Sequence, residues 1–414
     1  MRLNKLIKST ACFIAICLAS IMLIGCSKKE SSVIKNEETN KIIKPTEIEI
    51  TESTSEYITE STAETEEETP MQNLNEAIIR NNIESYLNNL NDLSKNLTEN
   101  TIYSPVSLDA ALQLQSYIVE DNSIIKNYLG DIDYLNYIYN KDASSVSTLW
   151  LDSNKEYNIS NIPLSVDIQY LDMTSKDATK TKNNYVSEHT NGFIDSTPTE
   201  FTKDTIVDIM NILYFKSNWI EKLYEDSNYQ VFHDINNNEI NIPYMLSEKG
   251  DYIYIGDISK AYKLKYTNGY EFYAVLPNDN LDTVNNADLA KDIESYISDN
   301  FQPTSGDITF KMPEIDIYNE IDLGKTNYAS LLSSPISKDF YNDEVDGISI
   351  NQVVKLKLDK YGTEAAAVTE VISFSTATIP EEKEQYELIF DRPFIFFIYD
   401  TQNNDILFIG TKTK

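Results

Sequence analysis

The apolar residues of this chain are spaced first as in helices and then as in strands. Between Asn73 and Leu93 they fall on one helical face, which carries Leu74, Ile78, Ile83, Leu87 and Leu90. A second helix is predicted after Ser104, because Ser104 can cap its first turn and Pro105 is compatible with that turn. The folded region is therefore predicted to begin with helices.

From about Ser144 onward, runs rich in β-branched and aromatic residues dominate, bounded by Gly, Pro, Asn or Asp. The runs are VSTLWL, TIVDIMNILYFKS, YIYIGDI, YEFYAVLP, DITFKMP, ISINQVVKLKL, YELIF, FIFFIYD and DILFIG. Helical patterns interrupt them near Asn286 to Ser298 and Leu323 to Leu332. Helices followed by a strand-rich remainder predict an α+β domain with a large, mostly antiparallel sheet.

Residues 1–25 have the layout of a secretory signal peptide, with a cationic start and an apolar run from Ala11 to Ile24. A transmembrane helix is the alternative, but the run is short for one. It ends in Leu23-Ile24-Gly25-Cys26, which resembles a bacterial lipobox and implies a mature protein that starts at Cys26 with a diacylglycerol on its sulfur. We expect an extracytoplasmic protein, lipid-anchored to the bacterial cell membrane at the cell surface.

Residues 26–71 are rich in Ser, Thr, Glu, Lys and Asn and cannot bury enough apolar surface to offset the entropy of ordering. Repulsion among the glutamates should extend this segment. We predict a disordered tether that holds a single domain, residues 72–414, away from the membrane.

Charge and cysteine content exclude several functions. With 66 acidic and 34 basic residues, the net charge of −32 opposes binding to nucleic acid and to anionic lipid headgroups. All three cysteines, Cys12, Cys17 and Cys26, lie in the signal segment, so the domain has no thiol for catalysis, metal binding or a disulfide.

The domain also offers little for catalysis. His189 and His233 are its only histidines, and it contains no Gly-x-Ser-x-Gly, His-Glu-x-x-His or phosphate-binding Gly-rich motif. The segment from Asp234 to Ile240 alternates oxygen-bearing side chains as a calcium loop does, but it lacks the turn glycine, so a polar hairpin tip is favoured. We expect neither an enzyme nor a bound metal or cofactor.

A run of small residues from Gly362 to Phe374 interrupts the strand pattern. Displayed as a strand, one face carries Thr363, Ala365, Ala367, Thr369, Val371 and Ser373. The other face carries Glu364, Ala366, Val368, Glu370, Ile372 and Phe374. From the residues alone a capped helix is the alternative, since Thr-Glu-Ala-Ala-Ala has good helix propensity.

This run resembles the hinge of inhibitory serpins, which are protease inhibitors. The matching hinge residues are Gly362, Thr363, Glu364, Ala365, Ala366, Ala367, Val368 and Thr369. Further matches, in order, are Asn100 with YSPVSLDAAL, STLWL, NNYVSEHTNGFI, IVDIMNILYFKSNWIEKL, FKMPEI and FDRPFIFFIYDTQNNDILFIG. The resemblance implies the serpin fold: N-terminal helices packed on a large central sheet, smaller sheets, and an exposed reactive-centre loop at about residues 362–385.

The resemblance also implies a suicide mechanism against a serine or cysteine protease. The protease would cleave the loop and form an acyl-enzyme, and the hinge would then insert into the sheet and trap the protease. Asn211 and Gln352 match the family's shutter, where Gln352 replaces a common histidine and can still hydrogen-bond to Asn211. Trp219 matches the breach. The alternative is a non-inhibitory serpin-fold lipoprotein that binds a partner at the cell surface.

Two counts along the loop place the scissile bond differently. Counting from Gly362 gives Thr376-Ala377, and counting back from Phe390 gives a bond near Glu382. The residues flanking the first bond are Phe374, Ser375, Thr378 and Ile379. Cleavage at Thr376 would suit an elastase-like or subtilisin-like protease, and cleavage after Phe374 a chymotrypsin-like one. Lys360 and Tyr361 replace the glutamates that are usual before the hinge glycine. We expect the protein to be a monomer.

Overall fold

The computed structural model describes residues 83–95, 97–139, 143–197, 200–202, 204–226, 228, 230–343, 345, 350–363 and 383–414. All of them lie in one compact unit, Glu67–Lys414. The predictions for the signal peptide, the tether, Cys26 and the loop from 364 to 382 fall outside the described residues. Within the described part, no helix has the length and apolar character needed to span a membrane.

Two helices predicted at the start of the domain are found where the structure describes them, while residues 73–82 of the first lie outside the described residues. Residues 83–93 are helical, and α2 follows at Pro105–Gln115, where the Ser104 hydroxyl accepts a hydrogen bond from the Ser107 N–H (3.2 Å). Helix α5 (Asn286–Ile297) agrees with the helical pattern near Asn286 to Ser298, whereas α3 (Ser123–Leu129), η1 (Tyr134–Asn136) and α4 (Ala178–His189) were not predicted.

Two predicted elements end differently in the structure. The helix expected over Leu323 to Leu332 is two short 3-10 helices, η2 (Leu323–Lys325) and η3 (Asn327–Leu332), because the Thr326 hydroxyl accepts from the Tyr328 N–H and starts a new turn. The strand predicted as YIYIGDI stops at Ile255. There the Asp292 carboxylate accepts hydrogen bonds from the N–H groups of residues 257 and 258 and holds a turn.

Among the described residues, the largest sheet has nine strands in the order β1-β18-β17-β11-β10-β9-β12-β16, with β6 paired to β9. Its strands are β1 (Thr101–Tyr103), β6 (Tyr224–Glu225), β9 (Tyr244–Ile255), β10 (Ser259–Lys265), β11 (Glu271–Pro277), β12 (Thr304–Pro313), β16 (Gln385–Ile389), β17 (Phe394–Asp400) and β18 (Asp405–Lys412). All neighbours are antiparallel except β12 and β16. The expected α+β class with a large, mostly antiparallel sheet is confirmed.

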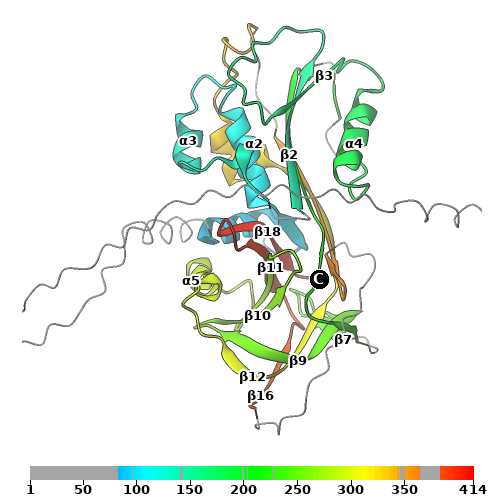
Figure 1. Ribbon diagram of the computed structural model, residues 1–414, viewed down its shortest axis with the longest axis vertical. Helices are drawn as coiled ribbons and strands as arrows, with labels where there is room; N and C mark the ends of the chain where they lie inside the picture. The colour runs from blue at the N-terminus through cyan, green and yellow to red at the C-terminus, as the bar shows by residue number, and fades with distance from the viewer. Residues whose placement is uncertain are drawn as a thin grey trace, which may run out of the picture. The chain divides into compact units, whose positions relative to one another are not determined.

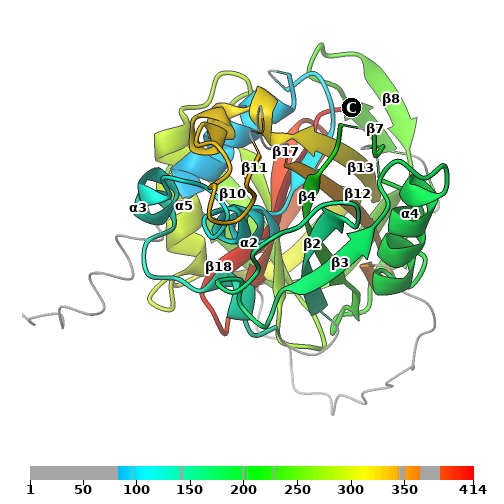
Figure 2. The ribbon, with the colours of Figure 1, turned by 90° about the horizontal axis from the view of Figure 1, so that it is seen from above.

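Two further sheets lie next to each other. One has the order β3-β2-β4 and the other β13-β14-β15-β5. Their strands are β2 (Ala143–Asp152), β3 (Asp167–Leu171), β4 (Val207–Phe215), β5 (Ser217–Asn218), β13 (Ile315–Asp322), β14 (Asn351–Asp359) and β15 (Gly362–Thr363). Helix α2 and helix α4 lie on opposite sides of β2 in both views (Figure 1, Figure 2).

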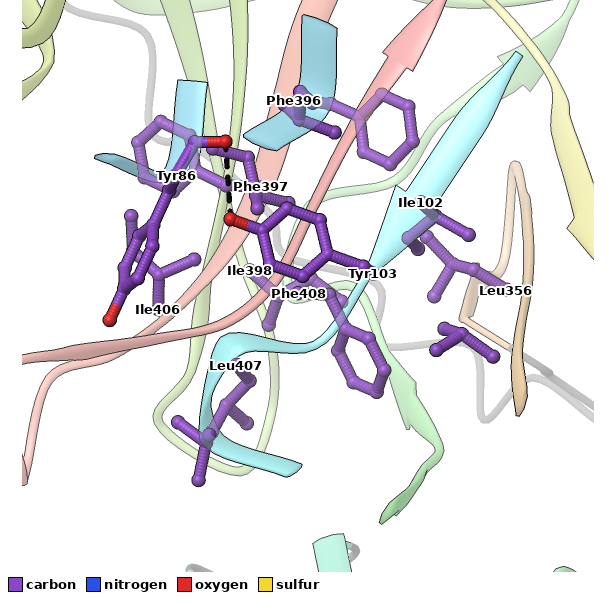
Figure 3. Packing of buried hydrophobic residues seen from close by; sticks show 14 of the residues in the cluster. Tyr86, Ile102, Tyr103, Leu356, Phe396, Phe397, Ile398, Ile406, Leu407 and Phe408 are labelled. Carbon is purple, nitrogen blue, oxygen red and sulfur yellow. Dashed lines mark hydrogen bonds between the residues drawn. The ribbon is translucent and has the colours of Figure 1, made fainter. Parts of the chain in front are cut away.

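Two clusters of buried apolar side chains follow from this layering. The main core fills the space between α2 and the nine-stranded sheet, where the Tyr103 hydroxyl donates to the Tyr86 carbonyl oxygen (3.1 Å; Figure 3). The smaller cluster lies under α4 and consists of Trp150, Met173, Val186, Ile194, Met210 and Ile212. Strand β4 therefore contributes to both clusters, with alternate residues on its two faces.

The predicted hairpin tip is present between β7 (Gln230–His233) and β8 (Glu239–Ile242). The Asp234 carboxylate accepts from the N–H groups of Asn236 (2.9 Å) and Asn238 (2.7 Å), and Asn237 has a φ of 63°. The acidic side chain thus closes a turn on its own backbone.

Candidate functional site

The boundary between β4 and β14, which we call the seam, is the candidate functional site. Strand β4 is fully paired with β2 on one edge, and β14 is fully paired with β13 on one edge. Across the seam, the described residues of the two strands form one isolated parallel bridge, between Ile209 and Ile350. The facing edges above this bridge are therefore not joined by a regular ladder.

The end of the seam at Ser217 and Leu358, which we call its upper end, is occupied by β15, the start of the predicted hinge. The bridge between Ile209 and Ile350 marks its lower end. Thr363 pairs with Leu358 of β14 on one side and with Ser217 of β5 on the other. The Thr363 side chain is fully buried, and its hydroxyl lies 2.6 Å from the Tyr266 hydroxyl. Gly362 has a φ of 145°, and a Cβ there would collide with the Ser217 carbonyl oxygen.

The registers at the two ends of the seam agree. From Ser217 down to Ile209 is eight residues, and from Leu358 down to Ile350 is also eight residues. The two strands thus advance by the same number of residues between the end where β15 lies between β5 and β14 and the direct bridge of Ile209 with Ile350. A chain continuing from Thr363 would meet matching positions on both edges.

Trp219 lies beside the upper end of the seam. Its indole stacks on Tyr266 with ring centroids 4.3 Å apart, and its Nε1–H donates to the Asp359 carbonyl oxygen (2.8 Å). Its backbone N–H donates to the Tyr361 carbonyl oxygen (3.1 Å). Burial raises the pKa of Tyr266, so its hydroxyl keeps its proton and remains a hydrogen-bond donor at physiological pH. Trp219 therefore braces the turn that leads into β15.

Two buried amides, Asn211 and Gln352, face the middle of the seam, and we call them the seam amides. The Asn211 amide nitrogen donates to the hydroxyls of Ser145 (3.0 Å) and Ser147 (2.8 Å). The Gln352 amide nitrogen donates to the Ser104 carbonyl oxygen (2.8 Å), and its oxygen accepts from the Ser104 N–H (3.0 Å). The two side chains thus have separate partners, Asn211 in β2 and Gln352 at the start of α2.

The predicted bond between Gln352 and Asn211 is wrong. The amide of Gln352 matches the donor and acceptor of the Ser104 backbone at the start of α2, and the Asn211 amide is satisfied by serines of β2. The serines were missed as site residues, although small polar residues in YSPVS and SSVS are an unusual feature of otherwise buried elements. No bond joins the seam amides directly, but the Ser107 hydroxyl of α2 donates to the Asn211 backbone carbonyl oxygen (3.3 Å), so the start of α2 is bonded to both edges.

Of the predicted hinge, Gly362 and Thr363 are described, and both lie in β15. The other hinge residues and the predicted bond Thr376-Ala377 with its flanking residues lie outside the described part of the chain. Before the hinge, the Lys360 ammonium pairs with the Glu225 carboxylate (2.8 Å), and Tyr361 is exposed. Within the residues described, no group of His, Cys, Asp and Glu is arranged to hold a metal ion.

Solved serpin structures share this fold. The native thermophilic serpin Tengpin matches with a TM-score of 0.64 and 19% identity over 86% of this chain and 96% of that chain. Serpin48 of the insect Tenebrio molitor matches with a TM-score of 0.64 and 20% identity over 82% of this chain and 98% of that chain. At such identities the likeness establishes the serpin fold alone.

The sequence comparison establishes the family. The family model "Serpin (serine protease inhibitor)" matches residues 131–414, and the chain belongs to the serpin family. Serpins are generally inhibitors of serine proteases rather than enzymes, and some members are non-inhibitory.

Individual relatives are distant. Alpha-1-antiproteinase of Rattus norvegicus is 29% identical over 251 residues, which cover 57% of this chain and 58% of the relative. Serpin-Z2 of Arabidopsis thaliana is 24% identical over 240 residues, covering 55% of each chain. The chain thus spans little more than half the length of these relatives. "Probable non-inhibitory serpin-Z5" of Arabidopsis thaliana is 25% identical over 374 residues, covering 78% of this chain and 79% of the relative.

Replacing Gly362 by alanine tests the fit of β15 in the seam. We expect a loss of stability of about 2 kcal/mol or more, because the positive φ and the collision with the Ser217 carbonyl would push β15 out of the sheet. Emission of Trp219, measured in a Trp150→Phe background because the chain has 2 tryptophans, should shift to the red. Lys360→Ala is the control, since its exposed ion pair contributes about 1 kcal/mol at most. Unchanged emission and melting temperature for Gly362→Ala would contradict the assignment.

Proposed function

We propose that this protein is an irreversible, suicide-type inhibitor of a serine or cysteine protease, displayed on the bacterial cell surface through a lipid at Cys26. The observation that carries the proposal is the seam. One bridge joins its lower end, while the first hinge residues already lie in register at its upper end. Such a sheet can accept one more strand.

The register supports insertion of the small-residue run. Continued from β15, it would bring Val371 between Ile209 and Ile350, the two residues of the isolated bridge. Thr369 would lie between the seam amides. Because Thr363 faces the core and side chains alternate, Ala365 would face the core as well. Small side chains on that face allow rapid insertion without a large opening of the sheet.

Insertion would supply the work of inhibition. A strand of about 14 residues spans on the order of 45 Å at ~3.4 Å per residue. Roughly a dozen new hydrogen bonds at ~1 kcal/mol each, with apolar burial, would contribute on the order of 10 kcal/mol or more. This free energy is released only after cleavage frees the loop, so it can be used to displace and distort the attached protease.

The chemistry itself belongs to the protease. Its serine or cysteine attacks the carbonyl carbon of Thr376, an ester or thioester forms, and the peptide nitrogen of Ala377 takes a proton and leaves. Insertion of the freed hinge must precede attack of water on that acyl bond. The small side chain of Thr376 suits an elastase-like or subtilisin-like protease, and cleavage after Phe374 instead would indicate a chymotrypsin-like one.

A non-inhibitory surface-binding lipoprotein is the second candidate. It is favoured by the replacement of the usual acidic residues by Lys360 and Tyr361 and by the similarity to a relative named as probably non-inhibitory. Such a protein would be cleaved in the loop and released without retaining the protease.

Incubation with an elastase-like and a subtilisin-like protease separates the two candidates. We expect the wild-type protein to form an SDS-resistant adduct with the protease. Mass spectrometry of the released fragment should identify Thr376-Ala377 as the cleaved bond. Thr363→Arg should abolish the adduct and leave cleaved product, because an arginine cannot be buried at this fully enclosed position. Tyr361→Arg, at an exposed position beside the hinge, should keep the adduct. Cleavage without adduct in the wild type, at every protease tested, would contradict inhibition.

Replacing Cys26 by alanine tests the lipid anchor separately. In a bacterial host with lipoprotein processing, the wild-type chain should incorporate labelled fatty acid and sediment with membranes. The Cys26→Ala variant should incorporate no label. Equal labelling of the two chains would contradict anchoring at Cys26, whatever the outcome of the protease assay.

A further inference from the structure

The seam is also bridged on its outer face, by α4 and the residues that follow it. Val186 of α4 and Ile194 pack with Met210 of β4 in the smaller apolar cluster. Val353 of β14, partly buried, packs against the same cluster from the other side of the seam. This α4 segment, residues 178–194, therefore contacts both edges that would have to part.

On the β4 side, the segment is held by a buried ion pair. The Lys182 ammonium lies 3.3 Å from the Asp208 carboxylate and 4.4 Å from the centroid of the Phe201 ring, and both charged side chains are more than nine-tenths buried. Burial raises the pKa of Asp208, while the nearby Lys182 opposes that rise. Breaking the pair would leave an uncompensated charge in an apolar cluster, so this contact holds α4 firmly on β4.

On the β14 side, besides the packing of Val353, the segment is held by the polar contact of Lys355. The Lys355 ammonium donates a hydrogen bond to the Phe193 carbonyl oxygen (2.9 Å) and lies 4.6 Å from the centroid of the Phe193 ring. Lys355 is partly exposed, so its ammonium can exchange this bond for water. The contact is specific but reversible.

The two attachments cannot both survive insertion of a strand. A new strand moves the flanking strands apart by about 4.8 Å, and a hydrogen bond is lost well before such a displacement. The partly exposed attachment is the one that yields.

We propose that Lys355 is a clasp for the sheet, a positioning residue whose bond to Phe193 ties the α4 segment across the seam and slows its opening. The inference rests on the proposed insertion of a strand at the seam. It adds a residue that determines the rate of strand insertion. Lys355 keeps the sheet closed until cleavage, and its bond to Phe193 breaks as β4 separates from β14.

The test measures insertion without a protease. A fluorescent peptide with the sequence of residues 365–376, AAAVTEVISFST, is added to the full-length protein and its association rate is followed by anisotropy. Lys355→Met, which keeps the aliphatic stem and removes the charge, should raise the rate by about tenfold or more, because the closed state loses a charge-assisted hydrogen bond. Lys355→Arg, which can restore the bond, should stay within about twofold of the wild type.

The matched control is Lys357→Met, on the same face of β14 at an exposed position. Its rate should equal that of the wild type. Equal rates for Lys355→Met and Lys357→Met, or a slower rate for Lys355→Met, would overturn the clasp and leave the proposed function intact. Failure of the peptide to associate with any variant would instead contradict insertion at the seam itself, and melting curves confirm that each variant is folded.

Discussion

The structure depends on the incomplete backbone pairing between strand β4 and strand β14. Strand β4 and strand β14 run in step, yet the described residues join them directly only at Ile209 and Ile350. Backbone donors and acceptors along a strand edge are strong groups that gain from pairing, so two edges that form no regular ladder among the described residues are a source of free energy held in the folded state. The rest of the molecule determines how that free energy is kept and when it can be released.

Contacts on the inner face, at the upper end and on the outer face of the seam each keep the sheet closed in a different way. On the inner face, the seam amides have separate partners, Asn211 in the serines of β2 and Gln352 at the start of α2, and the Ser107 hydroxyl of α2 also donates to the Asn211 carbonyl oxygen. At the top, Trp219 and Tyr266 enclose Thr363 and fix where an added strand would begin. On the outer face, the α4 segment spans both edges. Each layer is satisfied with the sheet closed, and none joins the strands as strongly as a full ladder would.

Local patterns predicted local features well. The Ser104 and Pro105 pair located the start of α2, and the polar run after Asp234 formed the expected hairpin tip. Features set by distant contacts could not be read in the same way. Gln352 found its partner 248 residues away at Ser104, where backbone groups matched its amide better than Asn211 did. Lys355 bonds to a carbonyl 162 residues away, and no local pattern encodes such a contact.

The seam itself shows why a sequence pattern stops short of function. Both β4 and β14 have the composition of ordinary buried strands, which does not reveal which of their two edges forms no regular ladder with the other described strands. The alternation in the run after Gly362 did predict which side chains could face a core, and the burial of Thr363 agrees with it. Only the resemblance to a family connected that run to a space in a sheet between strands far away in the chain.

A reversible crosslink across the seam tests this account most directly. Ile209→Cys and Ile350→Cys, combined with Cys26→Ala in the exported chain, place two cysteines opposite each other on adjacent strands, whose spacing of about 4.8 Å lies within the Cα–Cα range of disulfides. The account predicts that the oxidised protein is cleaved by its protease without forming an adduct, and that reduction restores the adduct. Equal adduct formation by the oxidised and reduced proteins would contradict the claim that these two strands must part.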